Sequence, residues 1–68
     1  MIKYENHFAE NLRPLRKSKS WTQENLANRL GVNKRTISAW ETGVCEPCIE
    51  ALIELCNIFD ETPENLLT

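Results

Sequence analysis

The chain has 68 residues, of which 41% are hydrophobic and 26% are charged. This length gives a single small domain, 1–68, and excludes a second core or a large catalytic cleft. No apolar run approaches the roughly 18–20 residues of a membrane span, and the N-terminus lacks the pattern of a secretory signal, so we expect a cytoplasmic protein.

The net charge of −2 is unevenly distributed along the chain. Between Asn11 and Val44 there are seven basic and two acidic residues, a net charge of +5. From Cys45 onward there are six acidic residues and no basic one, a net charge of −6. This asymmetry indicates a molecule with one face turned toward a polyanion, although two ordinary solvated surfaces would have the same composition.

The N-terminal segment leaves the start of the first helix open. Residues 1–10 have no clear period, and we interpret them as an arm or lead-in. Because a proline is tolerated in the first helical turn, Pro14 favours a first helix over 11–18 with Asn11 as its N-cap. A longer helix kinked at Pro14 is the alternative.

Two short helices follow, separated by a tight turn. Thr22 is a good N-cap, and Trp21 and Leu26 occupy the positions of a hydrophobic staple across it. Gly31 ends this helix as a residue free to adopt positive φ. Asn33 then caps a third helix that Gly43 closes. Its apolar residues predict an inward face, and the opposite, outward face comprises Lys34, Arg35, Ser38 and Ala39.

The C-terminal part predicts two further helices. Pro47 delays the fourth helix to about 48–59, and its apolar spacing predicts an inner stripe made of Ile49, Leu52, Ile53, Cys56 and Phe59. Thr62 and Pro63 are typical of an N-cap followed by a first helical residue. The expected fold is therefore all-α, a compact five-helix domain without strands.

The segment from Thr22 to Gly43 has the spacing of a helix-turn-helix. Here the chain resembles the phage repressor and Cro family, also called the XRE family, whose domains are lambda-repressor-like. The resemblance covers about 12–67 and rests on Thr22-Gln23-Glu24, Leu26-Ala27, Leu30-Gly31-Val32, and Thr36-Ile37-Ser38-x-Trp40-Glu41-x-Gly43.

The resemblance implies a role for each matching position. The third helix, about 33–42, would enter the major groove of DNA, with base contacts from Asn33, Lys34, Arg35, Ser38 and Ala39. Phosphate contacts would come from Thr22, Gln23, Thr42, Gly43 and Val44, and Arg13, Lys17 and Lys19 are further candidates. Arg16 and Glu41 would form a structural ion pair, for which a guanidinium and a carboxylate are well suited.

On this basis we expect a DNA-binding transcriptional regulator, a repressor, of bacterial or phage origin and associated with the nucleoid. It would bind a palindromic operator as a homodimer, with the acidic C-terminal half, including Leu66 and Leu67, as the dimer or partner surface. The alternative is an antitoxin-like or co-regulatory interaction module with weak DNA affinity. No membrane partner, small-molecule substrate, cofactor or enzymatic activity is expected.

Three positions depart from the family pattern. Pro14 is less usual in the first helix of the family. Ser20 stands where the family usually has glycine, which implies strain if its φ is positive. Cys48 stands at a cap position more often filled by serine. The Cys45-Glu-Pro-Cys48 pair supplies two thiols where tetrahedral zinc needs four ligands, so we interpret these cysteines as loop thiols, with a metal site and a regulatory disulfide as alternatives.

Overall fold

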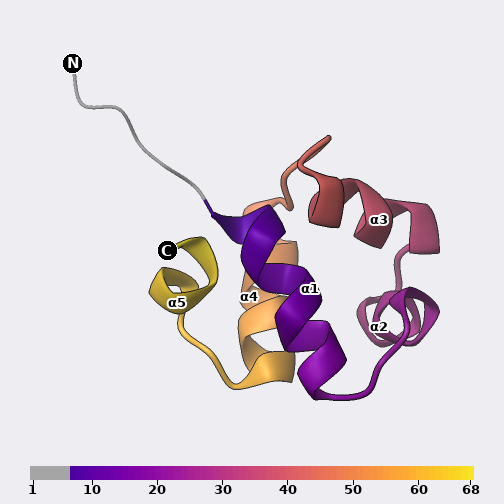
Figure 1. The fold of residues 1–68 in the computed structure, drawn as a ribbon, viewed down its shortest axis with the longest axis horizontal. Helices are drawn as coiled ribbons and strands as arrows, with labels where there is room; N and C mark the ends of the chain where they lie inside the picture. Colours follow the sequence, from indigo (N-terminus) through magenta and orange to yellow (C-terminus); the bar gives the residue numbers. More distant parts are fainter. Residues whose placement is uncertain (1–6) are drawn as a thin grey trace.

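The computed structural model describes residues 7–68 and shows an all-helical domain over that range (Figure 1). The expected five-helix fold is confirmed, and no strand occurs within the described residues. The helices are α1 (Phe8–Ser18), α2 (Gln23–Leu30), α3 (Lys34–Thr42), α4 (Ile49–Phe59) and α5 (Pro63–Leu67). Residues 1–6 of the expected arm lie outside the described part.

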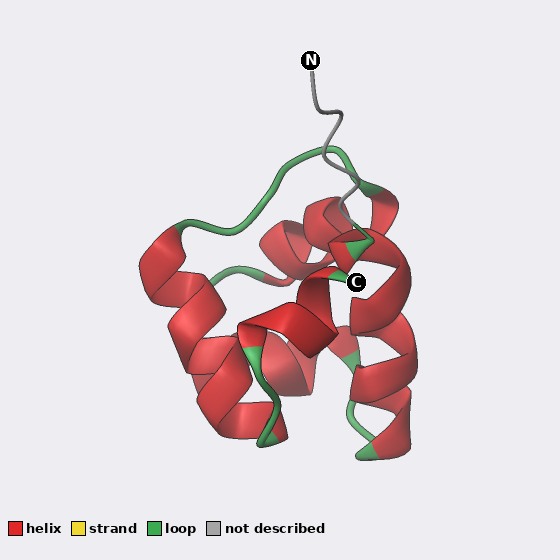
Figure 2. Ribbon diagram, turned by 90° about the vertical axis from the view of Figure 1, so that its left-hand side faces the viewer, coloured by secondary structure: helices red, strands yellow, loops and turns green. Residues whose placement is uncertain are grey.

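The core is formed where all five helices meet. α1 packs against α3 and α5, α2 packs against α3 and α4, and α4 also packs against α5. The loop between α3 and α4 arches over one end of the molecule (Figure 2). The buried hydrophobic side chains are Phe8, Leu12, Leu26, Ala27, Ile37, Trp40, Leu55, Phe59 and Leu66.

The preferred start of α1 at Asn11 is wrong, and the helix is as long as the alternative had it. The helix begins at Phe8, with His7 at the N-cap, so Asn11 is not its cap and Pro14 lies in the helix interior. An interior proline removes a backbone hydrogen bond and costs about 3 kcal/mol. The early start is favoured because it buries Phe8, whose ring meets Trp40 edge-on with centroids 6.4 Å apart. Burial of the aromatic side chain therefore outweighs the local preference of Pro14.

Asn11 instead connects α1 to α5. Its side-chain Nδ2 donates to the Leu66 carbonyl at 2.9 Å, and the His7 N–H donates to the Leu67 carbonyl at 2.9 Å. These two bonds satisfy carbonyls at the end of a five-residue helix that is too short to be stable alone. Thr62 caps α5 as predicted. Leu66 is fully buried, so its expected place on a dimer surface is wrong.

The helix-turn-helix is built as its sequence predicts. The Thr22 hydroxyl accepts from the Asn25 N–H at 3.0 Å, and the Asn25 side chain accepts from the Thr22 N–H at 3.0 Å, a reciprocal capping box. Gly31 adopts φ 71° and Asn33 caps α3. The turn and the starts of both helices are therefore determined by local hydrogen bonds.

The predicted inner stripe of α4 is rotated from the observed one. Leu55 and Phe59 are buried, whereas Ile49 and Ile53 are 76% and 53% exposed. Because α4 carries apolar residues on most of its circumference, its pattern is compatible with several buried faces. α4 begins at Ile49, and Cys48 at its N-cap makes no side-chain capping bond.

The loop from α1 to α2 contains the expected strain. Ser20 adopts φ 59°, a left-handed conformation that glycine would adopt more easily. Trp21 then packs at the edge of the core, and its ring centroid lies 5.6 Å from that of Phe59. The guanidinium carbon of Arg29 lies over the Trp21 ring, 4.2 Å from its centroid. The staple contact between Trp21 and Leu26 stays a prediction.

Candidate nucleic-acid interface

α3 has one buried side and one outward side. Ile37 and Trp40 are buried in the core, and Lys34 and Arg35 are exposed. Ser38 and Ala39 are half-buried. The helix therefore presents two cations near its N-terminus with small side chains beyond them, the arrangement that suits insertion into a major groove.

Asn33 has a structural task at the start of α3. Its Oδ1 accepts a hydrogen bond from the Arg35 N–H at 2.8 Å. Asn33 is exposed, so its amide nitrogen and the second lone pair of Oδ1 remain available to other partners. The base contact of Asn33 stays a prediction.

The Arg16–Glu41 ion pair joins α1 to the end of α3. Nε of Arg16 donates to Oε2 of Glu41 at 2.7 Å, and Nη2 donates to Oε1 at 3.2 Å. The side chains are 9% and 4% exposed. The remaining Nη1 donates to the Trp21 carbonyl at 2.7 Å. Because both charges are buried and each guanidinium nitrogen donates a hydrogen bond, this contact holds α3 at one angle to α1.

Gln23 belongs to the same network, a role that its place in the sequence does not predict. Its Nε2 donates to Oε1 of Glu41 at 3.1 Å. An amide nitrogen carries two donor hydrogens, so one remains for the predicted phosphate contact. Glu41 thus links α1, α2 and α3. The only feature of the sequence that could have indicated this bond is that a carboxylate such as Glu41 can accept hydrogen bonds from several donors.

An open hollow of about 390 Å³ lies beside this network. It is lined by Arg16, Thr22, Gln23, Glu24 and Lys34. The first backbone N–H groups of α2 and the ammonium of Lys34 favour an anion there. The guanidinium of Arg16 is already paired and the carboxylate of Glu24 opposes an anion, so Lys34 supplies the attraction. The hollow brings two predicted phosphate residues, Thr22 and Gln23, next to a predicted base-contacting residue.

The loop after α3 offers fewer donors than the resemblance implied. The Thr42 hydroxyl donates to the helix carbonyls of Ser38 or Ala39, at 3.0 and 3.3 Å. The N–H groups of Gly43 and Val44 close the C-terminus of α3, with the Val44 bond to Ala39 at 2.9 Å. These bonds commit the donors of 42–44 to the cap. The phosphate contacts of residues 42–44 stay predictions.

The remaining predicted phosphate residues lie on α1 and at its C-cap. Arg13, Lys17 and Lys19 are exposed. Their roles on DNA stay predictions.

The cysteines are all free. Cys45 and Cys48 are exposed, and Cys56 is half-buried. Burial raises the pKa of the Cys56 thiol, with a smaller increase from nearby Glu61. Within residues 7–68 there is no group of three or more histidine, cysteine or acidic side chains placed to hold a metal ion.

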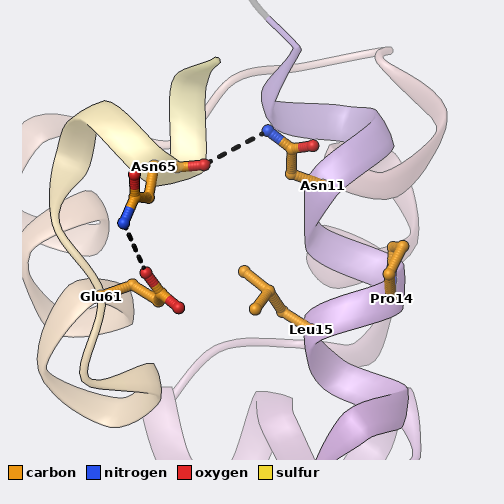
Figure 3. A pocket seen from close by; sticks show the side chains of 5 residues that line it. All are labelled: Asn11, Pro14, Leu15, Glu61 and Asn65. Carbon is orange, nitrogen blue, oxygen red and sulfur yellow. Dashed lines mark hydrogen bonds between the residues drawn. The ribbon is translucent and has the colours of Figure 1, made fainter.

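A second hollow, of about 400 Å³, lies between α1 and α5. Figure 3 shows its lining side chains, including Pro14 and Leu15 of α1 and the bond from Asn65 to Glu61 at 2.9 Å. None of its lining residues is a predicted DNA contact. Figure 1 shows α5 and α3 on opposite sides of α1.

No helix within residues 7–68 has the length and apolar character needed to cross a membrane.

A protein-family model described as a helix-turn-helix domain matches residues 9–68. The chain is 42% identical over 60 residues to the uncharacterized HTH-type transcriptional regulator YqaE of Bacillus subtilis, covering 88% of this chain and 52% of that protein. It is 40% identical over 58 residues to the HTH-type transcriptional regulator AnsR of the same organism, covering 85% of this chain and 50% of the relative. The chain thus spans about half the length of these two relatives.

Among solved structures, the P22 c2 repressor protein in complex with a synthetic operator has a TM-score of 0.84 and 30% identity. That match covers 98% of this chain and 97% of the other. A second match is the restriction-modification controller protein C.AhdI from Aeromonas hydrophila, with a TM-score of 0.79 and 28% identity, covering 88% of this chain and 91% of the other.

Proposed function

The chain belongs to the helix-turn-helix domain family, and we propose that it is a sequence-specific DNA-binding transcriptional regulator that acts as a repressor. The observation that carries this proposal is the way in which α3 is held against the rest of the fold. Its outward side carries Lys34 and Arg35, while its far end is held by the buried Arg16–Glu41 pair. A rigid support of this kind is what a base-contacting helix needs, because small errors in its angle displace its side chains from the base edges.

Sequence recognition comes from the N-terminal half of α3 in this proposal. Lys34 and Arg35 carry donors that match O6 and N7 of guanine, and Ala39 suits contact with a thymine methyl group. Ser38 can contact any of several bases, and Asn33 can donate a hydrogen bond from its amide nitrogen.

Position on the duplex comes from phosphate contacts. Thr22 and Gln23 lie at the N-terminus of α2 beside the hollow that Lys34 lines, where a backbone phosphate would meet N–H groups and a cation. Arg13, Lys17 and Lys19 add non-specific attraction. Residues 42–44 would contact the sugar-phosphate backbone of the DNA through complementary shape.

The repressor acts in the cytoplasm at the nucleoid, as a homodimer on a palindromic operator. The α3 helices of the two copies would occupy two successive major grooves, about 34 Å apart. A solved relative of the same fold is recorded in complex with a synthetic operator, which supports operator binding by this fold.

A second candidate is an antitoxin-like or co-regulatory interaction module with weak DNA affinity. The exposed side chains of Val44, Ile49 and Ile53 favour it, since an interaction module requires an apolar surface. It differs from the first proposal in predicting no preferred DNA sequence.

Selection from a random duplex pool at two salt concentrations tests the two candidates. We expect one enriched sequence and an affinity that falls steeply with salt. Arg35→Ala should weaken binding by about 1–3 kcal/mol and relax the preference at one base position. Arg13→Ala, the matched arginine control on α1, should weaken all sequences alike, as should Gln23→Ala. A pool without enrichment would leave the interaction module as the better candidate.

A further inference from the structure

The hollow between α1 and α5 has no part in the proposed contacts with DNA. It has a volume of about 400 Å³ and is lined by Asn11, Pro14, Leu15, Glu61 and Asn65. Sites for small ligands begin at volumes of about 300 Å³. The side chains of Leu15 and Glu61 point toward one another across the hollow (Figure 3). The hollow therefore has an apolar wall on α1 and a carboxylate facing that wall.

The carboxylate of Glu61 has room for a further partner. Its Oε2 accepts a hydrogen bond from Nδ2 of Asn65 at 2.9 Å, and no cation within residues 7–68 forms an ion pair with it. Glu61 is half-buried, and it is the one charged residue of the five that line the hollow. Since a carboxylate offers about four lone-pair sites, its second oxygen and its charge are left for a ligand.

The amide donors beside Glu61 already serve the protein. Nδ2 of Asn65 donates to Glu61, and Nδ2 of Asn11 donates to the Leu66 carbonyl at 2.9 Å. The second of these bonds holds the five-residue α5 against α1. A ligand that needed these donors would have to break bonds that keep a short helix in place. A ligand that brings its own donors would leave them intact.

The α1 wall adds an apolar surface and another acceptor. Leu15 is half-buried, and Pro14 is exposed. Because Pro14 has no N–H, the Glu10 carbonyl lacks its usual helical donor at the position of the proline ring. An aliphatic chain can lie along Leu15 and Pro14 while its polar end meets the carboxylate. The hollow thus suits a molecule with an aliphatic body and a donor-rich cationic end.

We propose that the α1–α5 hollow binds an aliphatic primary amine, in its ammonium form and as a free small molecule. The ammonium would donate to Oε1 of Glu61, and the alkyl chain would cover Leu15. A primary ammonium is a point charge with three donors, which one carboxylate oxygen can accept. A guanidinium fork is best matched by both oxygens, and Asn65 already donates to one of them. The site therefore prefers an amine to a guanidine.

The surroundings favour a small molecule over a protein partner. The exposed large hydrophobic side chains of residues 7–68 are Val44, Ile49 and Ile53, and none of them lines the hollow. A protein interface is built around an apolar centre. Because α5 and α3 lie on opposite sides of α1 (Figure 1), a ligand in the hollow leaves the outward face of α3 open. We therefore expect the amine and DNA to bind at the same time.

Binding is tested on the free 68-residue chain with n-butylammonium chloride at constant ionic strength and neutral pH. Amide spectra recorded by NMR should show saturable shifts at Leu15, Glu61 and Asn65. The dissociation constant should be about 1 mM, as expected of so small a ligand in an open hollow. The amides of Lys34 and Arg35 on α3 should not move.

Glu61→Gln tests the carboxylate. The glutamine oxygen can still accept from Asn65, so the local structure is kept while the charge is lost, and the affinity should fall about tenfold. Glu64→Gln is the matched control, because it removes the same charge from an exposed position of α5 that does not line the hollow. Its affinity should change less than about twofold. Equal losses would indicate diffuse attraction to the acidic C-terminal half and would overturn the site.

Relatives of the probe test the rest of the contact without altering the protein. n-Butyltrimethylammonium keeps the charge and the chain but has no N–H donor. n-Butylguanidinium replaces the ammonium with a planar fork, and methylammonium lacks the chain. Each should bind at least about fivefold more weakly than n-butylammonium. Equal binding of the trimethyl compound would overturn the hydrogen bond to Glu61 and with it the proposal.

A last compound distinguishes the two sources of such an ammonium. Nα-acetyl-lysine methylamide carries it on a peptide unit, and tighter binding of this compound than of n-butylammonium would overturn the free amine in favour of a lysine side chain of a partner protein. Absence of saturable shifts up to about 20 mM would overturn the site outright. Because no step of these titrations includes DNA, their failure leaves the proposed repressor function standing.

Discussion

α3 and α4 are both short amphipathic helices, yet their outward faces differ. α3 buries Ile37 and Trp40 and leaves polar or small side chains outside. α4 buries Leu55 and Phe59 and still leaves Ile49 and Ile53 exposed. The comparison shows that a helix with apolar residues on most of its circumference can satisfy the core and retain an apolar face. A helix with few apolar residues has no such surplus.

The two helices are also held in different ways. α3 begins at a capped residue and ends at Glu41, whose carboxylate is bonded to α1 and α2. α4 begins at Cys48 without a side-chain capping bond. α3 is therefore positioned by directional polar contacts, which define an angle, whereas α4 is positioned mainly by non-directional burial. This difference accords with the proposed contact of α3 with base edges.

The largest expected effect comes from removing the carboxylate that holds α3. Glu41→Ala leaves the buried guanidinium of Arg16 without its partner, and breaking such a pair costs roughly 3–5 kcal/mol. Urea denaturation should show a loss of that size, enough to unfold much of a 68-residue domain. The control Glu24→Ala, at an exposed position of α2, should stay within about 0.5 kcal/mol. Equal effects for the two variants would show that the pair does not hold α3.

The next effect tests which face of α4 is buried. Leu55→Ala should cost about 2–5 kcal/mol in the free energy of unfolding, because it opens a cavity in the core. Ile53→Ala should cost no more than about 0.5 kcal/mol, since Ile53 is half exposed. Thermal and urea melts of the two variants measure the difference directly. The reverse order would restore the inner stripe predicted from the sequence.

A third test contrasts the starts of α3 and α4 on DNA. Lys34→Ala should weaken operator binding by about 1–3 kcal/mol while the unfolding free energy stays within roughly 0.5 kcal/mol. A lysine at a helix N-terminus opposes the helix dipole, so its removal does not harm the fold. Glu50→Ala, near the start of α4, should cause no loss of affinity for a single half-site. Fluorescence anisotropy with a one-half-site duplex would detect a departure from this contrast.

The smallest effect concerns the caps. Asn33→Ala should destabilise the domain by about 1 kcal/mol, because the Arg35 N–H loses its acceptor. Cys48→Ser should stabilise it by about 0.5–1 kcal/mol, because a serine hydroxyl can accept a first-turn N–H of α4. Melting temperatures of the two variants should thus move in opposite directions. A neutral result for Cys48→Ser would mean that the loop does not let a side chain reach the first turn.

Much of this domain was predictable because the decisive interactions are local. The start of α2 at Thr22, the glycine turn at Gly31 and the cap at Asn33 each depend on hydrogen bonds within four residues. The pairing of Arg16 with Glu41 followed from the resemblance to a known family, and both partners are in place. The outward placement of Lys34 and Arg35 follows from the few apolar residues of α3.

The remaining features depend on distant partners. α1 extends back through Pro14 because Phe8 finds Trp40, and Asn11 serves α5 across the fold. Gln23 donates to Glu41, and α4 turns Leu55 inward, with Ile49 and Ile53 outward. The sequence by itself determined where α2 and α3 begin and end, since a cap or a glycine acts on its own neighbours. Only the tertiary structure decided which surplus apolar and polar groups find a partner, because burial depends on what the other helices bring.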